Sequence, residues 1–423
     1  MQLAKGVRDI PPEEKIVMNR VVETLRQAFE LYGFAPLETP ILERYETLAA
    51  KGGAGEESDS LKETFTLTDQ GERKLALRFE LTTSLARFIA MNPQLKLPFK
   101  RYEMGPVFRD GPIKLGRYRQ FWQCDIDTVG CKSMLADAEI LAIVQEAFQR
   151  FDLKILIKVN NRKLINGILE QCGIKDKELA IIAIDKLDKI GVKGVIEELI
   201  QRGYNREQID KLFSLIKEKI TLKELKSKIK NPEGLEGLKE LEDLFDYLKT
   251  MKVNTAIFDV SLARGLGYYT GTVFEAFAVS GPVTSSLAGG GRYDQMIGKF
   301  AGGGREIPTV GIAFGLAPIM DVLKSQQQFK EKNLAKAFVI PIQTLKESLK
   351  IVQQLRKKKI AVDMDLSGRG MGKNLEYAST LGIPYCIIIG GNELQQNKIL
   401  LRDMESGKQE LLNLKEIVKK LKK

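Results

Sequence analysis

The segment GPVFRDGPIKLGRYRQFWQ carries residues suited to chemistry on a phosphate group. A strand ends at Arg109, a polar loop follows, and a second strand begins near Arg119. An antiparallel hairpin of this kind presents a guanidinium group, which grips phosphate oxygens in a bidentate manner and keeps its charge. Arginines clustered on a hairpin are also common as plain surface charge, so this segment alone leaves both interpretations open.

A second segment, SLARGLGYYTGTVFEAF, places Arg264 before two glycines and the pair Tyr268 and Tyr269. Glycines allow a ligand to approach the backbone closely, and tyrosines offer a hydroxyl and a flat apolar face to a small polar ligand. The alternative is a glycine kink in a strand that carries two core tyrosines.

The third segment, LAGGGRYDQMIGKFAGGGREIPTVGIAFG, is rich in glycine but contains no GK[ST] sequence. It therefore does not follow the plan of a phosphate-binding loop between a strand and a helix, nor that of a dinucleotide fingerprint. We interpret its glycines as residues that let a nucleotide lie against a sheet, with a plain turn as the alternative.

The elements that must position these segments follow from hydrophobic periodicity. After Pro11-Pro12, apolar residues recur at helical spacing up to Tyr32, and Gly33 follows where a C-terminal cap belongs. Strand patterns then crowd together, which predicts an antiparallel sheet. These strands are expected at 34–43, 65–70, 74–80, 99–109 and 119–130.

Further along, a helix is expected at 134–151 and a strand at 155–160, and residues 161–250 are mostly helical in pattern. Strand patterns return at 255–263, 268–278 and 309–315, and residues 325–334 have the composition of a linker. Beyond the linker, strand and helix patterns alternate, which predicts a small α/β domain with a parallel sheet.

Composition narrows the chemistry. None of the 423 residues is histidine, which removes the commonest general base and metal ligand. The four cysteines form no C-x-x-C pair, so a zinc site lacks ligands. No apolar run reaches the roughly 20 residues of a membrane helix, and the N-terminus has no signal-peptide core. We expect a cytoplasmic protein whose reaction depends on arginine, carboxylate, tyrosine and backbone groups.

The positive charge is concentrated at the C-terminal end. The net charge is +11, and residues 331–423 contain 18 Lys+Arg against 10 Asp+Glu. A polyanionic partner is the functional interpretation, because cations that neutralise phosphates release counterions. A solvated lysine-rich surface is the alternative.

Taken in order, the three segments resemble the class II aminoacyl-tRNA synthetases, and in detail the histidyl-tRNA synthetase family. LYGFAPLETPILE is similar to class motif 1, with Pro40 at its turn, and the arginine hairpin is similar to motif 2. RGLGYYTG resembles the signature of histidyl enzymes, and TVGIAFGLAPI stands where motif 3 belongs. The resemblance spans nearly the whole chain.

The resemblance implies an α+β catalytic domain, formed by 1–171 and 246–325, in which an antiparallel sheet is covered by helices. It also implies a helical insertion at 172–245 and an α/β anticodon-binding domain at 331–423. The expected substrates are ATP with Mg²⁺ bound through its phosphates, histidine and its tRNA, and the expected assembly is a homodimer.

The family pattern also implies roles for individual residues. The amino acid is expected to contact Glu80, Thr82, Gln123, Asp127, Tyr268 and Tyr269, the first three through its amino group and Asp127 and Tyr269 through the imidazole. Arg109 is expected on the α-phosphate with Arg264 across it, and Arg119 and Arg292 complete the ATP site. Arg369, Lys373 and Asn374, at a loop and helix start, are expected to contact tRNA.

The chain departs from the family pattern at two points. Gly267 replaces an acidic residue of the signature, and motif 3 ends Gly315-Leu316-Ala317-Pro318 where an arginine is usual. We expect Arg292 or Arg305 to compensate for that arginine. The departure leaves two alternatives to a synthetase open. One is a non-catalytic histidine sensor of the ATP phosphoribosyltransferase regulatory type, and the other is a module that only binds RNA.

Overall fold

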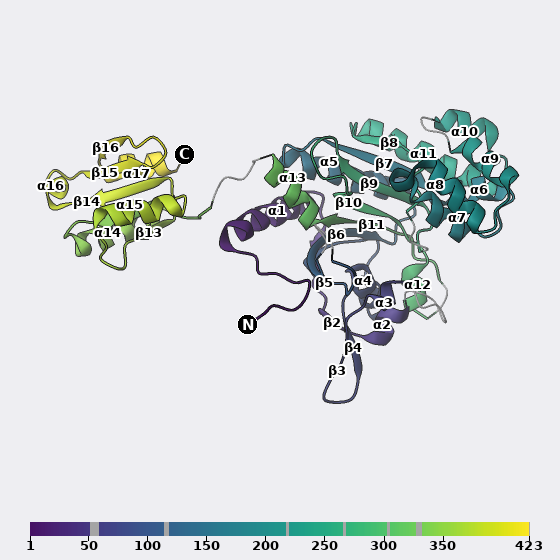
Figure 1. Cartoon of the computed structure of the whole chain (residues 1–423), viewed down its shortest axis with the longest axis horizontal. Coiled ribbons are helices and arrows are strands. Elements are labelled where there is room, and N and C mark those ends of the chain that lie inside the picture. The colour runs from purple at the N-terminus through teal and green to yellow at the C-terminus, as the bar shows by residue number, and fades with distance from the viewer. Residues whose placement is uncertain are drawn as a thin grey trace. The chain divides into compact units, whose positions relative to one another are not determined.

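The computed structural model describes residues 1–50, 59–113, 118–216, 220–264, 268–302, 305–326 and 332–422. The chain divides into two compact units, which are described separately (Figure 1). The first unit comprises Met1–Arg8 and Val21–Gln326, and the second comprises Asp9–Arg20 and Gln327–Lys423. No helix among the described residues has the length and apolar character needed to cross a membrane.

An eight-stranded sheet forms the centre of the first unit, with the order β1-β5-β6-β11-β10-β9-β7-β8. All neighbouring pairs are antiparallel except the two at the edges, β1 with β5 and β7 with β8. This confirms the antiparallel sheet predicted from the sequence. The strands are β1 (Ala35–Pro36), β5 (Phe99–Phe108), β6 (Gln120–Val129), β7 (Ile155–Asn161), β8 (Ala256–Phe258), β9 (Thr272–Ala278), β10 (Ala288–Arg292) and β11 (Thr309–Gly315).

One face of this sheet is apolar and is covered by helices α1 (Pro12–Leu31) and α5 (Met134–Arg150). The ring of Phe314 on β11 lies 5.3 Å from that of Phe29 on α1 and 6.0 Å from that of Phe148 on α5, measured between centroids. Helix α13 (Leu316–Ser325) contacts β6 on this side (Figure 1). Because this face is fully occupied by core packing, ligand chemistry is left to the opposite face.

The opposite face is only partly covered, by α4 (Thr82–Met91) and α12 (Met296–Phe300), which contact each other. A small three-stranded sheet of order β2-β4-β3 adjoins this region. Its strands are β2 (Leu42–Arg44), β3 (Thr66–Thr68) and β4 (Lys74–Leu77), and two short helices accompany it, α2 (Tyr45–Ala49) and α3 (Asp59–Lys62).

Strand β10 lies inside the glycine-rich stretch, where the sequence analysis expected no strand. It pairs with β9 on one side and β11 on the other. Its three consecutive glycines have little intrinsic preference for a strand. The two neighbouring strands impose the extended conformation, and glycine lets them approach without side chains between them.

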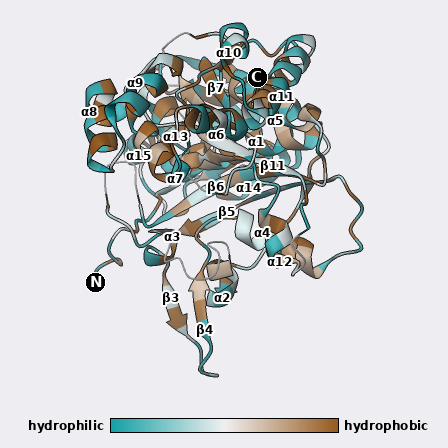
Figure 2. Ribbon diagram, turned by 90° about the vertical axis from the view of Figure 1, so that its right-hand side faces the viewer, coloured by the Kyte–Doolittle hydropathy of each residue, from teal (hydrophilic) through white to brown (hydrophobic). Residues whose placement is uncertain are grey.

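Helices α6 to α11 form a compact layer at one end of the sheet (Figure 1). They are α6 (Arg162–Gln171), α7 (Lys177–Ile184), α8 (Leu187–Gln201), α9 (Arg206–Leu215), α10 (Leu222–Lys228) and α11 (Pro232–Thr250). Asparagine, aspartate or threonine side chains cap α6, α7, α9, α10 and α11. Figure 2 shows teal and brown alternating around these helices, as expected for amphipathic helices packed on one side.

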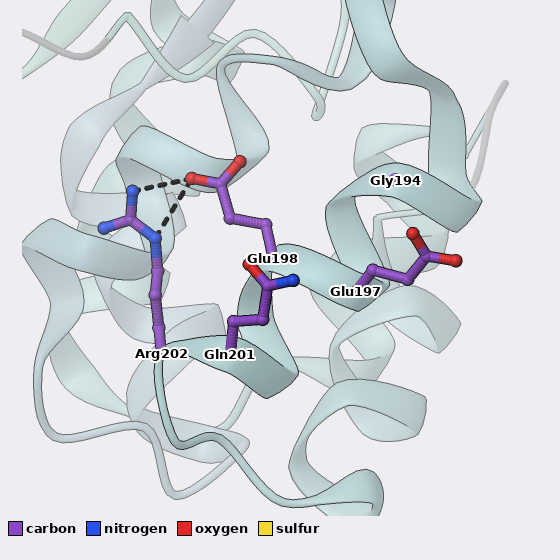
Figure 3. A pocket seen from close by; sticks show the side chains of 5 residues that line it. All are labelled: Gly194, Glu197, Glu198, Gln201 and Arg202. Carbon is purple, nitrogen blue, oxygen red and sulfur yellow. Dashed lines mark hydrogen bonds and ion pairs between the residues drawn. The ribbon is translucent and has the colours of Figure 1, made fainter.

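Two of these helices cross at very short range. A Cβ atom on Gly167 of α6 would lie 2.5 Å from the Cα atom of Gly234 on α11, and one on Gly237 would meet the backbone of Leu164. Helix α8 is kinked at Gly191, whose φ is 68°. Beyond the kink, Gly194, Glu197, Glu198, Gln201 and Arg202 line a surface hollow, in which Arg202 donates to Glu198 (Figure 3).

The second unit contains a five-stranded sheet of order β13-β12-β14-β15-β16. Its elements are β12 (Ala337–Pro341), α14 (Leu345–Lys357), β13 (Val362–Met364), α15 (Met371–Thr380), β14 (Tyr385–Ile389), α16 (Gly391–Gln395), β15 (Ile399–Asp403), β16 (Gln409–Leu412) and α17 (Leu414–Leu421).

The predicted parallel sheet of this unit is only partly correct. Strands β13, β12 and β14 are parallel, but β15 and β16 run antiparallel to their neighbours. The reason is the length of the connections. Helices α14 and α15 provide crossovers between parallel strands, whereas the short turn between β15 and β16 can only form a hairpin.

Candidate active site

Alternation along β6 places Gln123, Asp125 and Asp127 on the partly open face of the sheet. On the next strand, Glu103 lies opposite Asp125 and Arg101 lies opposite Asp127. On the other side, Gly311 of β11 lies opposite Asp127, and a Cβ atom there would lie 1.8 Å from Asp127 Oδ1. The absence of a side chain on Gly311 therefore leaves room for the carboxylate.

Glu80 lies at the start of α4. Its carboxylate accepts hydrogen bonds from the backbone N–H groups of Thr82, at 2.6 Å, and Thr83, at 3.0 Å. The side chain is buried, with 8% exposure. A carboxylate at a helix N-terminus is stabilised by these N–H groups and by the helix dipole. The resemblance assigned Glu80 and Thr82 to one role, and the structure brings them together.

Arg109 continues the hairpin beyond β5, where its backbone N–H donates to the carbonyl of Arg119 at 2.9 Å. Its guanidinium carbon lies 4.4 Å from the centroid of the Phe79 ring and 4.9 Å from that of Phe121. Burial lowers the pKa of this arginine from its ordinary value. The two rings hold a cation in place beside the polar face, with its donor edge available to an anion.

Arg264 and the tyrosine pair cross the glycine strand. A Cβ atom on Gly289 would lie 2.3 Å from Arg264 Nη1, and one on Gly291 would lie 2.9 Å from the ring of Tyr269. The rings of Tyr268 and Tyr269 are 4.6 Å apart. Because they lack side chains, Gly289 makes room for Arg264 and Gly291 makes room for Tyr269. Gly267 lies outside the described residues.

Within the described residues, Arg264 contacts Glu275 and the ring of Tyr269, 5.6 Å from its centroid. Its Nε lies 3.4 Å from Glu275 Oε1, and its buried Nη1 has no hydrogen-bond partner among the described residues. Buried donors are nearly always satisfied in folded proteins. A guanidinium nitrogen left open beside the polar face is therefore available for a ligand. Gln123 Oε1 is also buried and without a partner in the described part of the chain.

A buried network organises Asp127. Arg101, with no exposed side-chain surface, lies 2.7 Å from Asp127 Oδ2, and the hydroxyl of Tyr293 donates to Asp127 Oδ1. Burial raises the pKa of Asp127, while Arg101 and Tyr293 oppose that change. Tyr293 also makes an edge-to-face contact with Tyr268, 6.3 Å between centroids.

Sequence reasoning did not identify Tyr293 or Arg101 as site residues. Tyr293 follows directly on the glycine strand, so its place beside β6 became predictable only once β10 was known to be a strand. Arg101 lies two residues before Glu103 in a strand that the sequence did predict. The alternation of that strand could have placed it on the polar face.

The structure does not bring Arg292 to this site. Its side chain points to the opposite face of the sheet, where it pairs with Asp137 of α5 and donates to the Cys131 carbonyl at 2.8 Å. It is 2% exposed. Strand alternation explains this, because Arg292 is one residue out of phase with Gly289 and Gly291. We therefore withdraw Arg292 from the expected ATP contacts.

The other two arginines expected at the ATP site, Arg119 and Arg305, are paired elsewhere or exposed. Arg119 Nη1 pairs with Asp110 Oδ1 at 2.7 Å, and Arg305 is an exposed residue. Pro318 lies in the first turn of α13, where proline is tolerated because its missing N–H has no partner in the helix. The position that is an arginine in the family pattern thus carries no charge here.

In the second unit, the expected tRNA contacts separate into two kinds. Arg369 and Lys373 are exposed, and the guanidinium of Arg369 lies 4.3 Å from the centroid of the Tyr377 ring. Asn374 is fully buried, and its Nδ2 donates to Asp365 at 3.0 Å and to the Arg369 carbonyl at 2.9 Å. The prediction that Asn374 contacts tRNA is wrong for its side chain, which instead holds the loop that presents Arg369.

Comparisons with known proteins identify the family. Residues 6–319 match the family model described as histidyl-tRNA synthetase, and residues 336–423 match that of an anticodon-binding domain. The chain is 44% identical over 413 residues to histidine–tRNA ligase 1 of Bacillus cereus, covering 96% of this chain and 94% of that protein.

Solved structures agree in fold. A histidyl-tRNA synthetase from Nostoc sp. PCC 7120 superposes with a TM-score of 0.87 at 32% identity, covering 100% of this chain and 98% of that one. An ATP phosphoribosyltransferase regulatory subunit/histidyl-tRNA synthetase from Bacillus halodurans shares the fold, with a TM-score of 0.75 at 21% identity and coverage of 89% and 96%. The family models and the near full-length identity show that this chain belongs to the histidyl-tRNA synthetase family.

Proposed function

We propose that this chain is a histidine–tRNA ligase that activates histidine with ATP and transfers it to its tRNA. One observation carries the proposal. The residues expected for the amino acid and for the α-phosphate, Glu80, Asp127, Tyr269, Arg109 and Arg264, surround a single face of the sheet. Gln123 and Tyr268 lie on the same face.

In the activation step, a carboxylate oxygen of histidine attacks the α-phosphorus of ATP, and the bond to pyrophosphate breaks. The substrate carboxylate is already ionised, so the step needs no base from the protein. Arg109 and Arg264 supply positive charge where charge builds up in the transition state, and the site holds the reactants in line. Mg²⁺ enters with ATP, bound through its β- and γ-phosphates.

In the transfer step, a ribose hydroxyl of the tRNA terminus attacks the carbonyl carbon of the adenylate. An oxygen of the adenylate phosphate accepts the hydroxyl proton, and AMP leaves. Neither step calls for imidazole from the protein, which is consistent with a chain that has none.

Specificity for histidine is assigned to the buried end of the site. Asp127 accepts from one imidazole nitrogen, and Tyr269 contacts the other, with Tyr268 beside it. Arg101 Nη2 lies 2.7 Å from Asp127 Oδ2, and the Tyr293 hydroxyl donates to Asp127 Oδ1, so both oxygens of this carboxylate are held in place. A site built to hydrogen-bond the substrate rejects analogues that leave its buried polar groups unpaired.

The remaining assignments are also proposals. Residues 1–171 and 246–325 are assigned to catalysis, 172–245 to a helical insertion that contacts tRNA, and 331–423 to recognition of the anticodon. Arg119 is retained as an ATP contact, which requires its ion pair with Asp110 to open. We further propose a homodimer that acts in the cytoplasm.

A histidine sensor without catalytic activity is the second candidate, and Pro318 in place of the motif 3 arginine is the observation that favours it. Two features weigh against it: the open Nη1 of Arg264, which a sensor for histidine alone would not require, and the match of residues 336–423 to an anticodon-binding domain.

The test is exchange of labelled pyrophosphate into ATP by the purified full-length chain, with Mg²⁺ and each amino acid in turn. The ligase gives exchange with histidine and background with the other amino acids. A chain that binds histidine but gives no exchange is the sensor, and one that binds only RNA is the third alternative.

A further inference from the structure

Asp125 is the central carboxylate of the polar face, and no role has been assigned to it so far. It lies on β6 between Gln123 and Asp127 and is 3% exposed. Its Oδ1 is buried without a hydrogen-bond partner, and no lysine or arginine of the described ranges pairs with it. A buried carboxylate without a partner is costly, so its retention at the middle of a binding face requires an explanation.

The other acidic residues on this face already have hydrogen-bond or ion-pair partners in the protein. Glu103 accepts from Arg78 Nη1 at 2.9 Å and from the Thr39 hydroxyl at 2.7 Å, and Arg101 is shared between Glu103 and Asp127. Glu80 is held by the N-terminus of α4. Arg78 and Arg101 thus pair with Glu103 and Asp127, and the helix N-terminus holds Glu80. Among the described residues, Asp125 is the acid of this face with no ion pair of its own.

Neighbouring groups show which part of a ligand would reach Asp125. The groups that face it are Arg101 and Glu103 on β5, Asp127 on β6, Glu80 before α4, Arg109 at the end of the hairpin, and Tyr268. On β11 the residue opposite Asp125 is Ala313, which is uncharged. Neither of the two described cations that face Asp125 forms an ion pair with it. Arg101 pairs with Asp127 and Glu103, and Arg109 is stacked between Phe79 and Phe121 and donates to the Phe79 carbonyl.

We propose that Asp125 binds the α-ammonium group of the amino-acid substrate, as a second carboxylate beside Glu80. This proposal rests on the proposed function and adds to it a residue that the family pattern did not supply. The ammonium group is the one cation that histidine brings at neutral pH. Asp127 already occupies the imidazole end, one strand repeat further along β6, which leaves Asp125 for the amino end.

Two consequences follow. Burial raises the pKa of Asp125 well above its ordinary value in the ligand-free protein, with Arg101 opposing this change. An arriving ammonium group favours the ionised carboxylate, so binding is expected to lower the pKa of Asp125 again. In addition, the substitution Asp125→Asn removes an unpaired buried carboxylate from the ligand-free protein. The same substitution removes the group proposed to bind the ammonium of the ligand.

The binding test compares three ligands on the full-length chain by calorimetry: histidine, histidinol, which keeps the ammonium group but lacks the carboxylate, and imidazole propionate, which lacks the ammonium group. Asp125→Asn is expected to weaken the binding of histidine and of histidinol by about tenfold to a hundredfold. The affinity for imidazole propionate is expected to change by less than about twofold. Asp152→Asn, an exposed aspartate in the same unit, serves as the charge-matched control.

A structural role for Asp125 would give a different result. It predicts a lower melting temperature for Asp125→Asn and equal losses for all three ligands, and either outcome overturns the proposal. The proposal predicts a melting temperature of the ligand-free variant at or above that of the wild type. Unchanged affinity for histidine and histidinol in Asp125→Asn also overturns it.

A second measurement requires no variant. Calorimetry of the wild-type chain, repeated over a pH series in two buffers of different ionisation enthalpy, is expected to show more proton release with histidine than with imidazole propionate. Equal proton release with both ligands contradicts the proposal. If the wild type binds neither histidine nor imidazole propionate, the proposed function itself has failed, which is a separate outcome.

Discussion

The polar face of the first unit and the loop 365–374 of the second unit use the same residue types in opposite ways. On the polar face the groups proposed to act, such as Arg264 and Asp125, are themselves largely buried and left open on one side. In the loop, the buried Asp365 and Asn374 are used up in holding the backbone, and the exposed Arg369 and Lys373 are free to meet a partner. The buried groups Arg264 and Asp125 are thus proposed to meet a ligand, whereas the buried groups Asp365 and Asn374 hold the backbone of their loop.

The two aspartates make the contrast sharpest. Asp365 accepts from the backbone N–H groups of Ser367, at 2.9 Å, and Arg369, at 2.7 Å, and from Asn374. Although burial alone would raise its pKa, these hydrogen bonds bring it below its ordinary value. Asp125 has no such donors, and its pKa is raised. Asp365 is thus matched by donors of its own loop, whereas Asp125 has no such match among the described residues.

The largest expected effect tests the first half of this comparison. Arg109→Ala should reduce histidine-dependent pyrophosphate exchange by about 10²–10³-fold, because it removes charge that the transition state requires. Charging of tRNA should fall with it. Arg73→Ala, an exposed arginine paired with Asp69 in the same unit, is the control and should keep full exchange. An Arg109 variant within tenfold of the wild type would remove this residue from the active site.

The next effect tests the scaffold role of Asp365. Asp365→Asn should destabilise the loop by about 2 kcal/mol, since a charged acceptor of three donors becomes neutral. Amide exchange of peptides from residues 365–374 in the full-length chain should then accelerate by roughly thirtyfold. Glu376→Gln, an exposed change on α15, should leave exchange unaltered. Equal protection in both variants would show that the loop does not depend on this carboxylate.

A smaller effect separates the two units by function. Arg369→Ala should lower kcat/KM for tRNA in the charging reaction by about tenfold and reduce its salt dependence by about one counterion. Pyrophosphate exchange should be unchanged. Lys408→Ala, another exposed cation of the second unit, provides the control. Loss of exchange in Arg369→Ala would contradict the assignment of this residue to tRNA.

The smallest effect is the dependence on pH, for which the two aspartates have opposite signs. The stability that Asp365 contributes is present above the ordinary value of 3.8 and is lost as the pH falls through its lowered pKa. Any contribution from protonated Asp125 is present below that value and is lost as the pH rises through its raised pKa.

The melting temperature of ligand-free Asp125→Asn, relative to that of the wild type, should therefore increase with pH by on the order of 1–2 °C. The deficit of Asp365→Asn should shrink in acid. Thermal unfolding across a pH series measures both trends, and parallel curves for the two variants would show that the aspartates do not differ in this way.

The sequence predicted the elements with strong periodicity and missed those defined by their neighbours. Helix α1 ends where Gly33 predicted, with φ of 76°, and β5, β6 and β11 lie within a residue or two of their expected bounds. Strand β10 was missed because glycine has little strand preference, and its conformation comes from pairing. Helix α17 was missed although its capping box, Asn413 with Glu416, is a signal visible in the sequence.

For the candidate site, the resemblance to the family identified candidate residues but did not predict the directions of their side chains. Arg292 and Asn374 stand at plausible positions in the sequence. The side chain of Arg292 nevertheless lies on the opposite face of the sheet, and that of Asn374 is buried in its loop, because strand phase and loop packing decide the direction of a side chain. Asp125, Arg101 and Tyr293 were missed for different reasons. The alternation of β5 could have placed Arg101 on the polar face, whereas Tyr293 required β10 to be known as a strand, and Asp125 required knowledge of which acids have ion-pair partners.

Strand β10 has a consequence for how this chain tolerates change. Every codon substitution away from glycine adds a Cβ atom, and at Gly289, Gly290 and Gly291 that atom would lie 2.1–2.5 Å from a neighbouring heavy atom. Hydrophobic core positions accept substitutes of similar volume, whereas these three positions have no substitute of similar volume. The segment with the least side-chain information is therefore expected to be among the least mutable in the molecule, and drift should accumulate around it rather than within it.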